Sequence, residues 1–258
     1  MMFPISPAIP RAALITGGAH RVGLAIAQAL AQAGFSIAIH CRSSVAMAEE
    51  AAASLPTRAV VLPADLGDES QVEALLPRAT EALGPIGVLV NNASAFERDE
   101  WHDSTRESWD AHMGPNLRAP FVLTQAFAKA LPAGREGAVI NLLDQRVWSL
   151  TPHFVSYTVS KAGLWTLTQT MALALAPLRI RVNGIGPGPA LPSPRQSQEQ
   201  FDKQARSVPL GHGTSPEEVG RAVLAILALP AMTGQMLALD GGQHLQWASG
   251  HGAPAPEE

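Results

Sequence analysis

The 258-residue sequence contains one cysteine, no run of basic residues and no long apolar run. A lone cysteine, Cys41, excludes an internal disulfide and is typical of a reducing compartment, so we expect a cytoplasmic protein. The net charge of −4 and the lack of a basic run make nucleic acid and anionic membrane surfaces unexpected partners. No apolar run reaches the roughly 18 residues of a membrane span. Residues 1–10 lack the basic start and long apolar core of a signal peptide, so we expect none.

Short apolar runs alternate with helical patterns along the chain, and hydrophobic residues make up 47% of it. The connections are short and no linker separates two halves. We therefore expect one doubly wound parallel α/β sheet, a Rossmann fold in a single domain. We place this domain at 11–247, with an N-terminal extension over 1–10 and a disordered tail over 248–258. The expected strands are 12–16, 36–40, 58–62, 88–91, 138–143, 180–185 and 236–240. The expected helices lie near 24–33, 44–54, 70–82, 107–131, 154–176 and 215–229, and a proline-rich loop with a short helix precedes the last one.

A glycine-rich turn from Gly17 to Gly23 lies between the first expected strand and the first expected helix. Glycine lets the backbone approach a pyrophosphate, and the N-terminus of the following helix stabilises its charge. The second expected strand ends without an Asp or Glu that could bind both ribose hydroxyls. Instead Arg42, with Ser43 and Ser44, offers a guanidinium and hydroxyls that suit a 2′-phosphate. We expect NADPH in preference to NADH; the alternative is an arginine on the surface of a turn.

Tyr157 and Lys161 stand four residues apart in a segment with a helical pattern, which places them on one face of the helix. A lysine ammonium beside a phenol stabilises the phenolate and lowers the phenol pKa from its usual value of about 10. The tyrosine then becomes a proton donor near neutral pH. A packed tyrosine beside a solvated lysine would give the same spacing, so the rest of the chain has to supply the context.

Several segments of the chain stand in the order found in one enzyme family. They are Thr16-Gly17-x-x-x-x-x-Gly23, Asp65-Leu66, Asn91-Asn92-Ala93, Asn116, Tyr157-x-x-x-Lys161, Asn183-x-x-x-Pro187-Gly188 and Asp240-Gly241-Gly242. Jointly they make the chain resemble the short-chain dehydrogenase/reductase family over about residues 11–246.

This resemblance implies a role for each matching residue. Asp65 and Leu66 would flank the adenine, and Asn92 and Ala93 the cofactor ribose. The expected cofactor-binding residues are Gly17, Arg21, Val22, Gly23, His40, Arg42, Ser43, Ser44, Asp65, Leu66, Asn92, Ala93, Tyr157, Lys161, Pro187 and Gly188. The expected catalytic residues are Asp144, Tyr157, Lys161 and Asn116, with Asn116 as the anchor of a water relay. No metal site is expected.

Three departures from the common family pattern resemble its pteridine reductase branch, which includes bacterial dihydromonapterin/dihydrofolate reductases. Arg21 replaces the middle glycine of the turn, Asp144 replaces the usual serine, and Asn-Asn-Ala is followed by Ser94-Ala-Phe96. A flat pterin can lie between nicotinamide and an aromatic ring such as Phe96. Asp144 can carry a proton or a charge, which suits a substrate that is protonated on nitrogen. The expected substrate-binding residues are Arg21, Ser94, Phe96, Asp144 and Tyr157; the alternatives are a surface arginine, a core phenylalanine and an aspartate that caps a loop.

The expected function is therefore NADPH-dependent reduction of a 7,8-dihydropterin. One alternative is a general carbonyl (3-oxoacyl-type) reductase, which would normally have serine at position 144 and glycine at position 21. Another is a nonenzymatic nucleotide-sensing protein, against which the Tyr157–Lys161 pair argues. The resemblance also implies a homotetramer formed through the helices near 107–131 and 154–176. Gly114-Pro115 falls inside the first of these, where we expect a kink because proline cannot donate to the Ala111 carbonyl.

Overall fold

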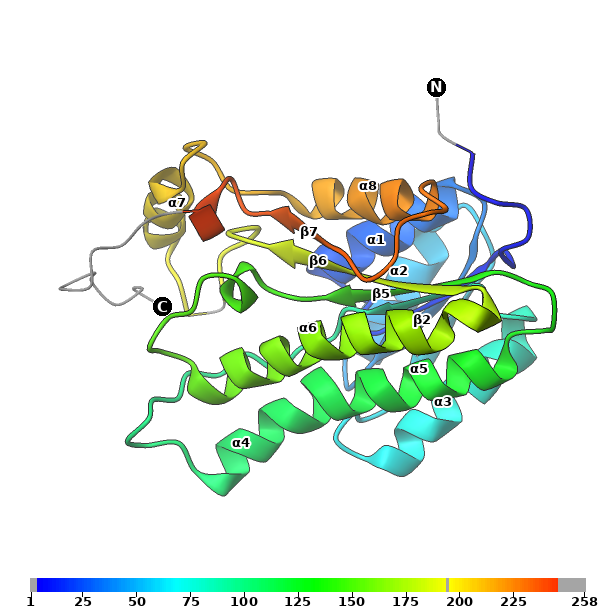
Figure 1. Ribbon diagram of the computed structural model, residues 1–258, viewed down its shortest axis with the longest axis horizontal. Helices are drawn as coiled ribbons and strands as arrows, with labels where there is room; N and C mark the ends of the chain where they lie inside the picture. The colour runs from blue at the N-terminus through cyan, green and yellow to red at the C-terminus, as the bar shows by residue number, and fades with distance from the viewer. Residues whose placement is uncertain (1–3, 194, 246–258) are drawn as a thin grey trace.

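The described residues of this computed structural model, 4–193 and 195–245, form a sheet of seven parallel strands (Figure 1). Its order is β3-β2-β1-β4-β5-β6-β7, which confirms the expected doubly wound sheet. The strands are β1 Ala12–Ile15, β2 Ser36–Cys41, β3 Ala59–Pro63, β4 Val88–Asn91, β5 Gly137–Leu142, β6 Ile180–Pro187 and β7 Met236–Leu239.

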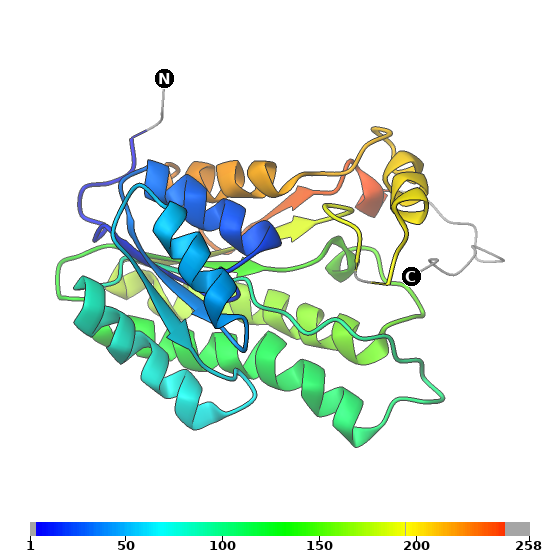
Figure 2. The ribbon, with the colours of Figure 1, turned by 180° about the vertical axis from the view of Figure 1, so that it is seen from behind.

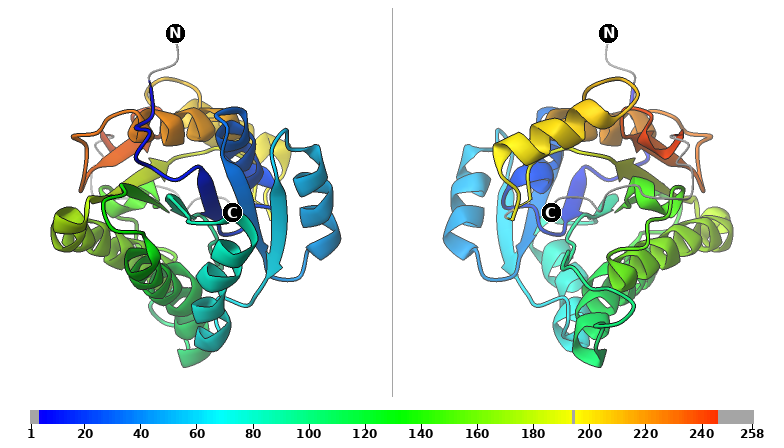
Figure 3. Two further views of the ribbon diagram at one scale, coloured as in Figure 1. Left: turned by 90° about the vertical axis from the view of Figure 1, so that its right-hand side faces the viewer. Right: turned by 90° about the vertical axis from the view of Figure 1, so that its left-hand side faces the viewer.

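Helices cover both faces of the sheet, and the views along the layers show this arrangement (Figure 3). One face packs against α1 Arg21–Gln32, α2 Val45–Ser54 and α8 Pro216–Leu227. The other packs against α3 Glu69–Leu83, α5 Ala119–Ala130 and α6 Val155–Leu175. The reverse view shows α1 and α2 in front of the sheet, with α8 beside α1 and α7 at the right (Figure 2). Strand β1 supplies both cores, because its side chains alternate: Ala13 and Ile15 join the first, Ala12 and Leu14 the second.

The expected long helix over 107–131 is interrupted. Helix α4, Arg106–Met113, continues through a π-helical turn, Gly114–Arg118, before α5 begins. Within this turn the Ala119 N–H donates to the Gly114 carbonyl, five residues back. Pro115 has no N–H to donate to Ala111, so the wider turn takes the place of the expected kink. Such turns are frequent at functional sites, and this one carries Asn116.

The loops after the strands gather at one edge of the sheet, where β1 and β4 lie side by side and the strand order reverses. Ligands of open α/β sheets bind at this switch point. Helix α7, Gln198–Ser207, lies beyond the same edge (Figure 1).

Of the expected extension over 1–10, the structure describes residues 4–10, and among these Ile9 packs into the core at 2% exposure. The expected tail over 248–258 lies outside the described residues. Among the described residues, no helix is both long enough and apolar enough to cross a membrane.

Candidate active site

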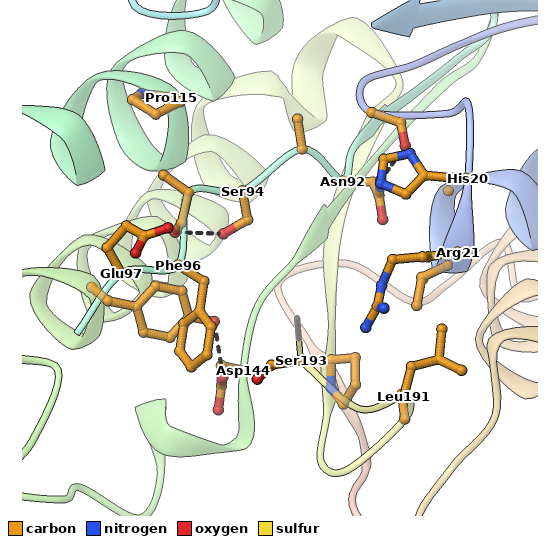
Figure 4. Close-up of a pocket in the computed structure, with 18 of the residues that line it drawn as sticks. His20, Arg21, Asn92, Ser94, Phe96, Glu97, Pro115, Asp144, Leu191 and Ser193 are labelled. Carbon is orange, nitrogen blue, oxygen red and sulfur yellow. Dashed lines mark hydrogen bonds between the residues drawn. The ribbon is translucent and has the colours of Figure 1, made fainter. Parts of the chain in front are cut away.

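A pocket of about 910 Å³ opens at the carboxyl edge of the sheet. Its size lies within the range of small-molecule and cofactor sites. All residues expected in the site line this pocket except Asn116 and Lys161, which lie behind its wall. Figure 4 shows two sides facing each other across it, one with Asn92 and Arg21 and the other with Phe96 and Asp144.

At two positions of the turn before α1, only glycine fits the backbone. Gly17 has a positive φ of 63°, and a Cβ on Gly23 would lie 2.1 Å from the Gly17 oxygen. The Asn92 amide donates to the carbonyls of Thr16 and Gly17 at 2.9 and 3.1 Å, which fixes the turn against the end of β4. The first turn of α1 contains no acidic residue, so its N-terminus is free to stabilise an anion.

His40 supports this turn from below. The Gly17 N–H donates to His40 Nδ1 at 3.1 Å, so the ring is neutral and its Nε2–H donates to the Ala64 carbonyl at 3.0 Å. Burial lowers the pKa of His40, which favours the same neutral form. Its side chain is therefore committed to shaping the glycine turn.

The end of β2 carries the groups expected to select the cofactor phosphate. Arg42 and Ser43 are exposed on the pocket rim, and Ser44 begins α2 without using its hydroxyl as a cap. Asp65 also lines the rim, but its Oδ1 accepts the Gly67 N–H at 2.8 Å and is tied into its own turn. The arginine guanidinium is thus available to an anionic group at this end.

Asp144 and Tyr157 meet at the other end of the pocket. The phenol donates a hydrogen bond to Asp144 Oδ2 at 2.9 Å, and Asp144 Oδ1 accepts the Arg146 N–H at 2.8 Å. Tyr157 is 6% exposed, whereas Asp144 at the carboxyl end of β5 is half-buried. The two residues therefore form an acid pair on the pocket wall.

Lys161 lies one turn along α6 from Tyr157, as the spacing predicted. It is 2% exposed, its Nζ donates to the Leu142 carbonyl at 2.7 Å, and it lies 5.8 Å from the centre of the Tyr157 ring. Burial lowers the pKa of Lys161 from 10.5 to about 8, against an opposing effect of the Asp144 charge. Its ammonium thus lies behind the acid pair, where its charge interacts with that of Asp144.

Asn116 is fully buried and joins the π turn to the loop after β4. Its amide exchanges two hydrogen bonds with the Ala95 backbone, at 2.8 and 2.9 Å, and donates to Ser160 Oγ at 3.1 Å. The side chain thus holds the loop that carries the expected substrate residues.

That loop presents Phe96 and Ser94. The Phe96 ring stacks on Phe154 at 4.8 Å between centres and meets the Tyr157 ring edge-on at 4.7 Å. Ser94 is exposed, and its hydroxyl donates to the Ala95 carbonyl at 3.2 Å.

Across the pocket, Arg21 has a positive φ of 53°, a costly conformation for this residue type that is common at functional sites. Its side chain points into the cavity and donates to the Pro192 carbonyl at 2.9 Å (Figure 4).

Several residues that line the pocket are not among those expected from the sequence. The loop after β6 contributes side chains from the proline-rich stretch, and Arg195 ties it to the opposite wall by hydrogen bonds to the Phe96 carbonyl and to Glu97. These contacts join residues about a hundred positions apart, and no local pattern indicates them. Arg146 is different, because its place beside Asp144 could have marked it. The missed lining residues include His20, Gly67, Glu97, Gln145, Arg146, Leu191, Ser193, Gln196, Gln204 and Gln243.

A family model described as Enoyl-(Acyl carrier protein) reductase matches residues 17–244. Among solved structures, the chain is similar to FolM alternative dihydrofolate reductase 1 from Brucella canis and from Brucella suis, each in complex with NADP. Both have a TM-score of 0.91 and 45% identity, over 95% of this chain and 98% and 100% of theirs.

Among curated proteins, the probable galactose dehydrogenase GalD of Rhizobium meliloti (strain 1021) is 33% identical over 62% of this chain, and the match spans 64% of that relative. The short-chain dehydrogenase/reductase eriH of Hericium erinaceus is 32% identical over 90% of this chain and 96% of its own length. The chain belongs to the short-chain dehydrogenase/reductase family.

Proposed function

We propose that this protein is an NADPH-dependent oxidoreductase of the pteridine reductase type. It reduces a 7,8-dihydropterin, of the dihydrobiopterin, dihydromonapterin or dihydrofolate type, to the tetrahydro form. The observation that carries the proposal is the hydrogen bond from Tyr157 to Asp144 on the pocket wall. The likeness to the two FolM structures with NADP, at 45% identity, supports it.

The nucleotide end of the pocket fits NADPH. The turn from Gly17 to Gly23 packs tightly on itself, since a Cβ at position 23 would meet the Gly17 oxygen, and it lines the pocket. The N-terminus of α1 favours the pyrophosphate, and the Arg42 guanidinium, with Ser43 and Ser44, favours the 2′-phosphate. His40 contributes through the shape of the turn. When bound, the cofactor supplies the hydride that substrate C6 receives.

Reduction of the N5=C6 bond also consumes a proton, and the acid pair is placed to deliver it to N5. The Tyr157 phenol donates to Asp144 Oδ2, so the proton that reaches N5 would come from the phenol by way of the carboxylate. A carboxyl group can pass a proton to an imine-type nitrogen, which a serine hydroxyl at this position would do poorly. Lys161 stabilises the phenolate that remains after transfer.

The remaining substrate residues would orient the pterin. The exposed part of the half-buried Phe96 ring offers a stacking surface, and Ser94 and Arg21 supply polar groups on either side of the cavity. Arg21 would exchange its hydrogen bond with Pro192 for one to the ligands. Asn116 keeps the Phe96 loop in place through Ala95.

The test is oxidation of NADPH, followed by its absorbance, with dihydrobiopterin and with an acetoacetyl thioester as competing candidates. We expect turnover of the dihydropterin and slower turnover with NADH. Reduction of the thioester alone would identify a carbonyl reductase. Tight NADPH binding without turnover of either compound would indicate a nucleotide-sensing protein.

We further propose that the protein acts as a cytoplasmic homotetramer. The outward face of α6 carries two apolar side chains, Val159 and Leu173, which are 41% and 81% exposed in the single chain. A leucine this exposed on a long helix is explained if a second copy covers it.

A further inference from the structure

Arg146 occupies an unusual position for a charged residue. It is 6% exposed in the short turn Gln145–Val147. Its guanidinium carbon lies 4.7 Å from the centre of the Phe154 ring, 5.5 Å from Phe96 and 6.0 Å from Tyr157. A guanidinium is attracted to the negative faces of aromatic rings, and here three rings surround one charge. The side chain of Arg146 is therefore part of the aromatic wall of the site.

These rings are the wall of the substrate end. Phe96 and Phe154 stack within 5° of parallel, and the edge contact to Tyr157 joins them to the acid pair. The Arg146 N–H also donates to Asp144 Oδ1, so one residue touches the wall with its side chain and the carboxylate with its backbone. Phe96 and Asp144 lie together at this side of the cavity (Figure 4).

The acid pair thus has a cation from each of two elements within about 6 Å of the phenol ring, Lys161 from α6 and Arg146 from the turn after β5. The two cations differ in the pH range over which they keep their charge. Lys161 loses its charge near pH 8, because burial lowers its pKa to about 8. A guanidinium keeps its charge throughout this range.

We propose that Arg146 is a positioning residue for the reduction, and that its fixed charge favours the phenolate form of Tyr157 while its planar group holds the Phe96 wall. The inference rests on the proposed function, since it concerns the group that delivers the proton. It extends that function by giving one side chain two tasks: its charge acts on the acid pair, and its planar group stacks on the rings.

Tyr157 is the only tyrosine in the sequence, so tyrosinate absorbance reports its ionisation alone, beside five tryptophans that do not ionise. The titration uses the full-length protein without substrate or cofactor. Arg146→Met removes the charge and leaves an unbranched apolar side chain in its place. We expect its tyrosinate midpoint to rise by about one pH unit, the scale of a unit charge roughly 6 Å away at an intermediate dielectric. Arg146→Lys keeps the charge, so its midpoint should stay near that of wild type.

Arg98→Met is the matched control. The Arg98 guanidinium also lies over Phe154, at 5.6 Å, but its side chain is 36% exposed, so water screens its charge. Arg98→Met removes an equal charge from the solvent side of the Phe154 ring, so we expect the tyrosinate midpoint to be unchanged. The other charged or titratable groups near the pair stay identical in all variants; they are Glu97 and Asp99 on the loop after β4, His112 on α4, His153 before α6, Lys161 on α6 and Arg21 across the pocket.

The stacking task is measured by kinetics on dihydrobiopterin. Arg146→Lys should raise KM about 10-fold with a smaller change in kcat, because the ammonium cannot lie flat on the rings. A midpoint in Arg146→Met that coincides with wild type, in protein with native near-UV circular dichroism, would overturn the inference. If Arg146→Met does not fold, Arg146→Gln carries the same expectation. The titration needs no turnover, so a protein inactive on dihydropterins but shifted by Arg146→Met would refute the proposed function and leave the effect of Arg146 on the pair established.

Discussion

A serine hydroxyl and an aspartate carboxyl can both accept the Tyr157 hydrogen bond, but only the carboxyl can release or take up a proton near neutral pH. With the proposed function, the side chain at position 144 is therefore expected to separate reduction of an imine-type substrate from reduction of a carbonyl. A substitution at this position should leave the fold intact. Asp144 is half-buried at the end of β5, outside the packed core, and a serine could still accept the Arg146 N–H.

We expect Asp144→Ser to lower kcat on a dihydropterin by about 10²-fold, the scale of a lost proton-transfer partner. The fold and NADPH affinity should be unchanged, which thermal unfolding and cofactor titration would check. Full pterin turnover with a pH–rate profile that superimposes on wild type would contradict the assigned role. A gain of ketone reduction would instead support the carbonyl reductase alternative.

Arg42→Asp tests cofactor selection at the other end of the pocket. It replaces an attractive charge with a repulsive one at the rim. NADPH affinity should fall by about 2 kcal/mol or more, the scale of a hydrogen bond between charged groups. NADH affinity, measured by the same fluorescence titration, should change far less. Arg58→Asp, an exposed arginine at the opposite end of the sheet, makes the same charge change as a control. Equal losses for the two cofactors would show that Arg42 does not bind the phosphate.

Among single residues, the sequence could identify those whose type alone suggests chemistry, such as Arg42, Asp144, Tyr157 and Lys161. It could not assign the orientation of a side chain. His40 illustrates this, because its ring turns inward to the Gly17 N–H. That hydrogen bond joins two strands and depends on the register of β1 with β2, in which Ile15 pairs with Ile39.

Among the structural elements, the loop after β4 depends most on contacts that no local pattern encodes. His112 on α4 is fully buried, and its Nε2 accepts the Glu97 N–H at 3.0 Å. Its Nδ1 lies 2.7 Å from Ser156 Oγ, which in turn donates to Asp99. Burial opposes ionisation of Asp99, but its hydrogen bonds from Ser156 and Ser104 outweigh this and lower its pKa. One network thus joins α4, the loop and the start of α6.

Two substitutions at His112 separate the halves of this network. Glutamine can place its amide oxygen where Nε2 stood and accept the Glu97 N–H, whereas asparagine reaches only the Ser156 side. Both variants should lose about 1–3 kcal/mol of stability to urea, the usual cost of a disturbed buried hydrogen bond. Only His112→Asn should also raise KM for the dihydropterin, by about 10-fold, with KM for NADPH unchanged. Equal KM values in the two variants would mean that the loop does not depend on this bond.

The long helix shows how far a local rule extends. Proline at position 115 predicts an irregularity, and the π turn occurs there. Its form, with Asn116 directed to the Ala95 backbone, depends on α5 and α6 packing beside it, which the sequence pattern did not reveal.

For the whole molecule, alternation of apolar runs with helical patterns was enough to predict the sheet class, because parallel strands buried on both faces leave a distinctive pattern.

The assembly of the chain into a tetramer needs a test of its own. Leu173→Glu should convert the proposed tetramer to smaller species in sedimentation velocity, since it places a charge on the outward face of α6. Leu210→Glu, at a leucine 67% exposed outside α5 and α6, is the matched control. A wild-type protein that sediments as a monomer would refute the tetramer.

The overall stability should carry a pH signature of the buried Lys161. Its pKa is about 8 in the folded chain, against 10.5 as the usual value. Below pH 8 both states hold the proton, and the folded state bears the full cost of the buried charge. Between about 8 and 10.5 the unfolded chain binds more protons, so stability rises with pH relative to a variant without this group. At about 1.4 kcal/mol for each pKa unit, the rise approaches roughly 3 kcal/mol. We would measure urea unfolding of Tyr157→Phe and of Tyr157→Phe/Lys161→Met at one protein concentration from pH 7 to pH 10, so that neither phenol titration nor assembly enters the difference. A difference in unfolding free energy that stays constant across this range would show that Lys161 keeps an ordinary pKa. Lys161 would then stay charged over the same pH range as Arg146.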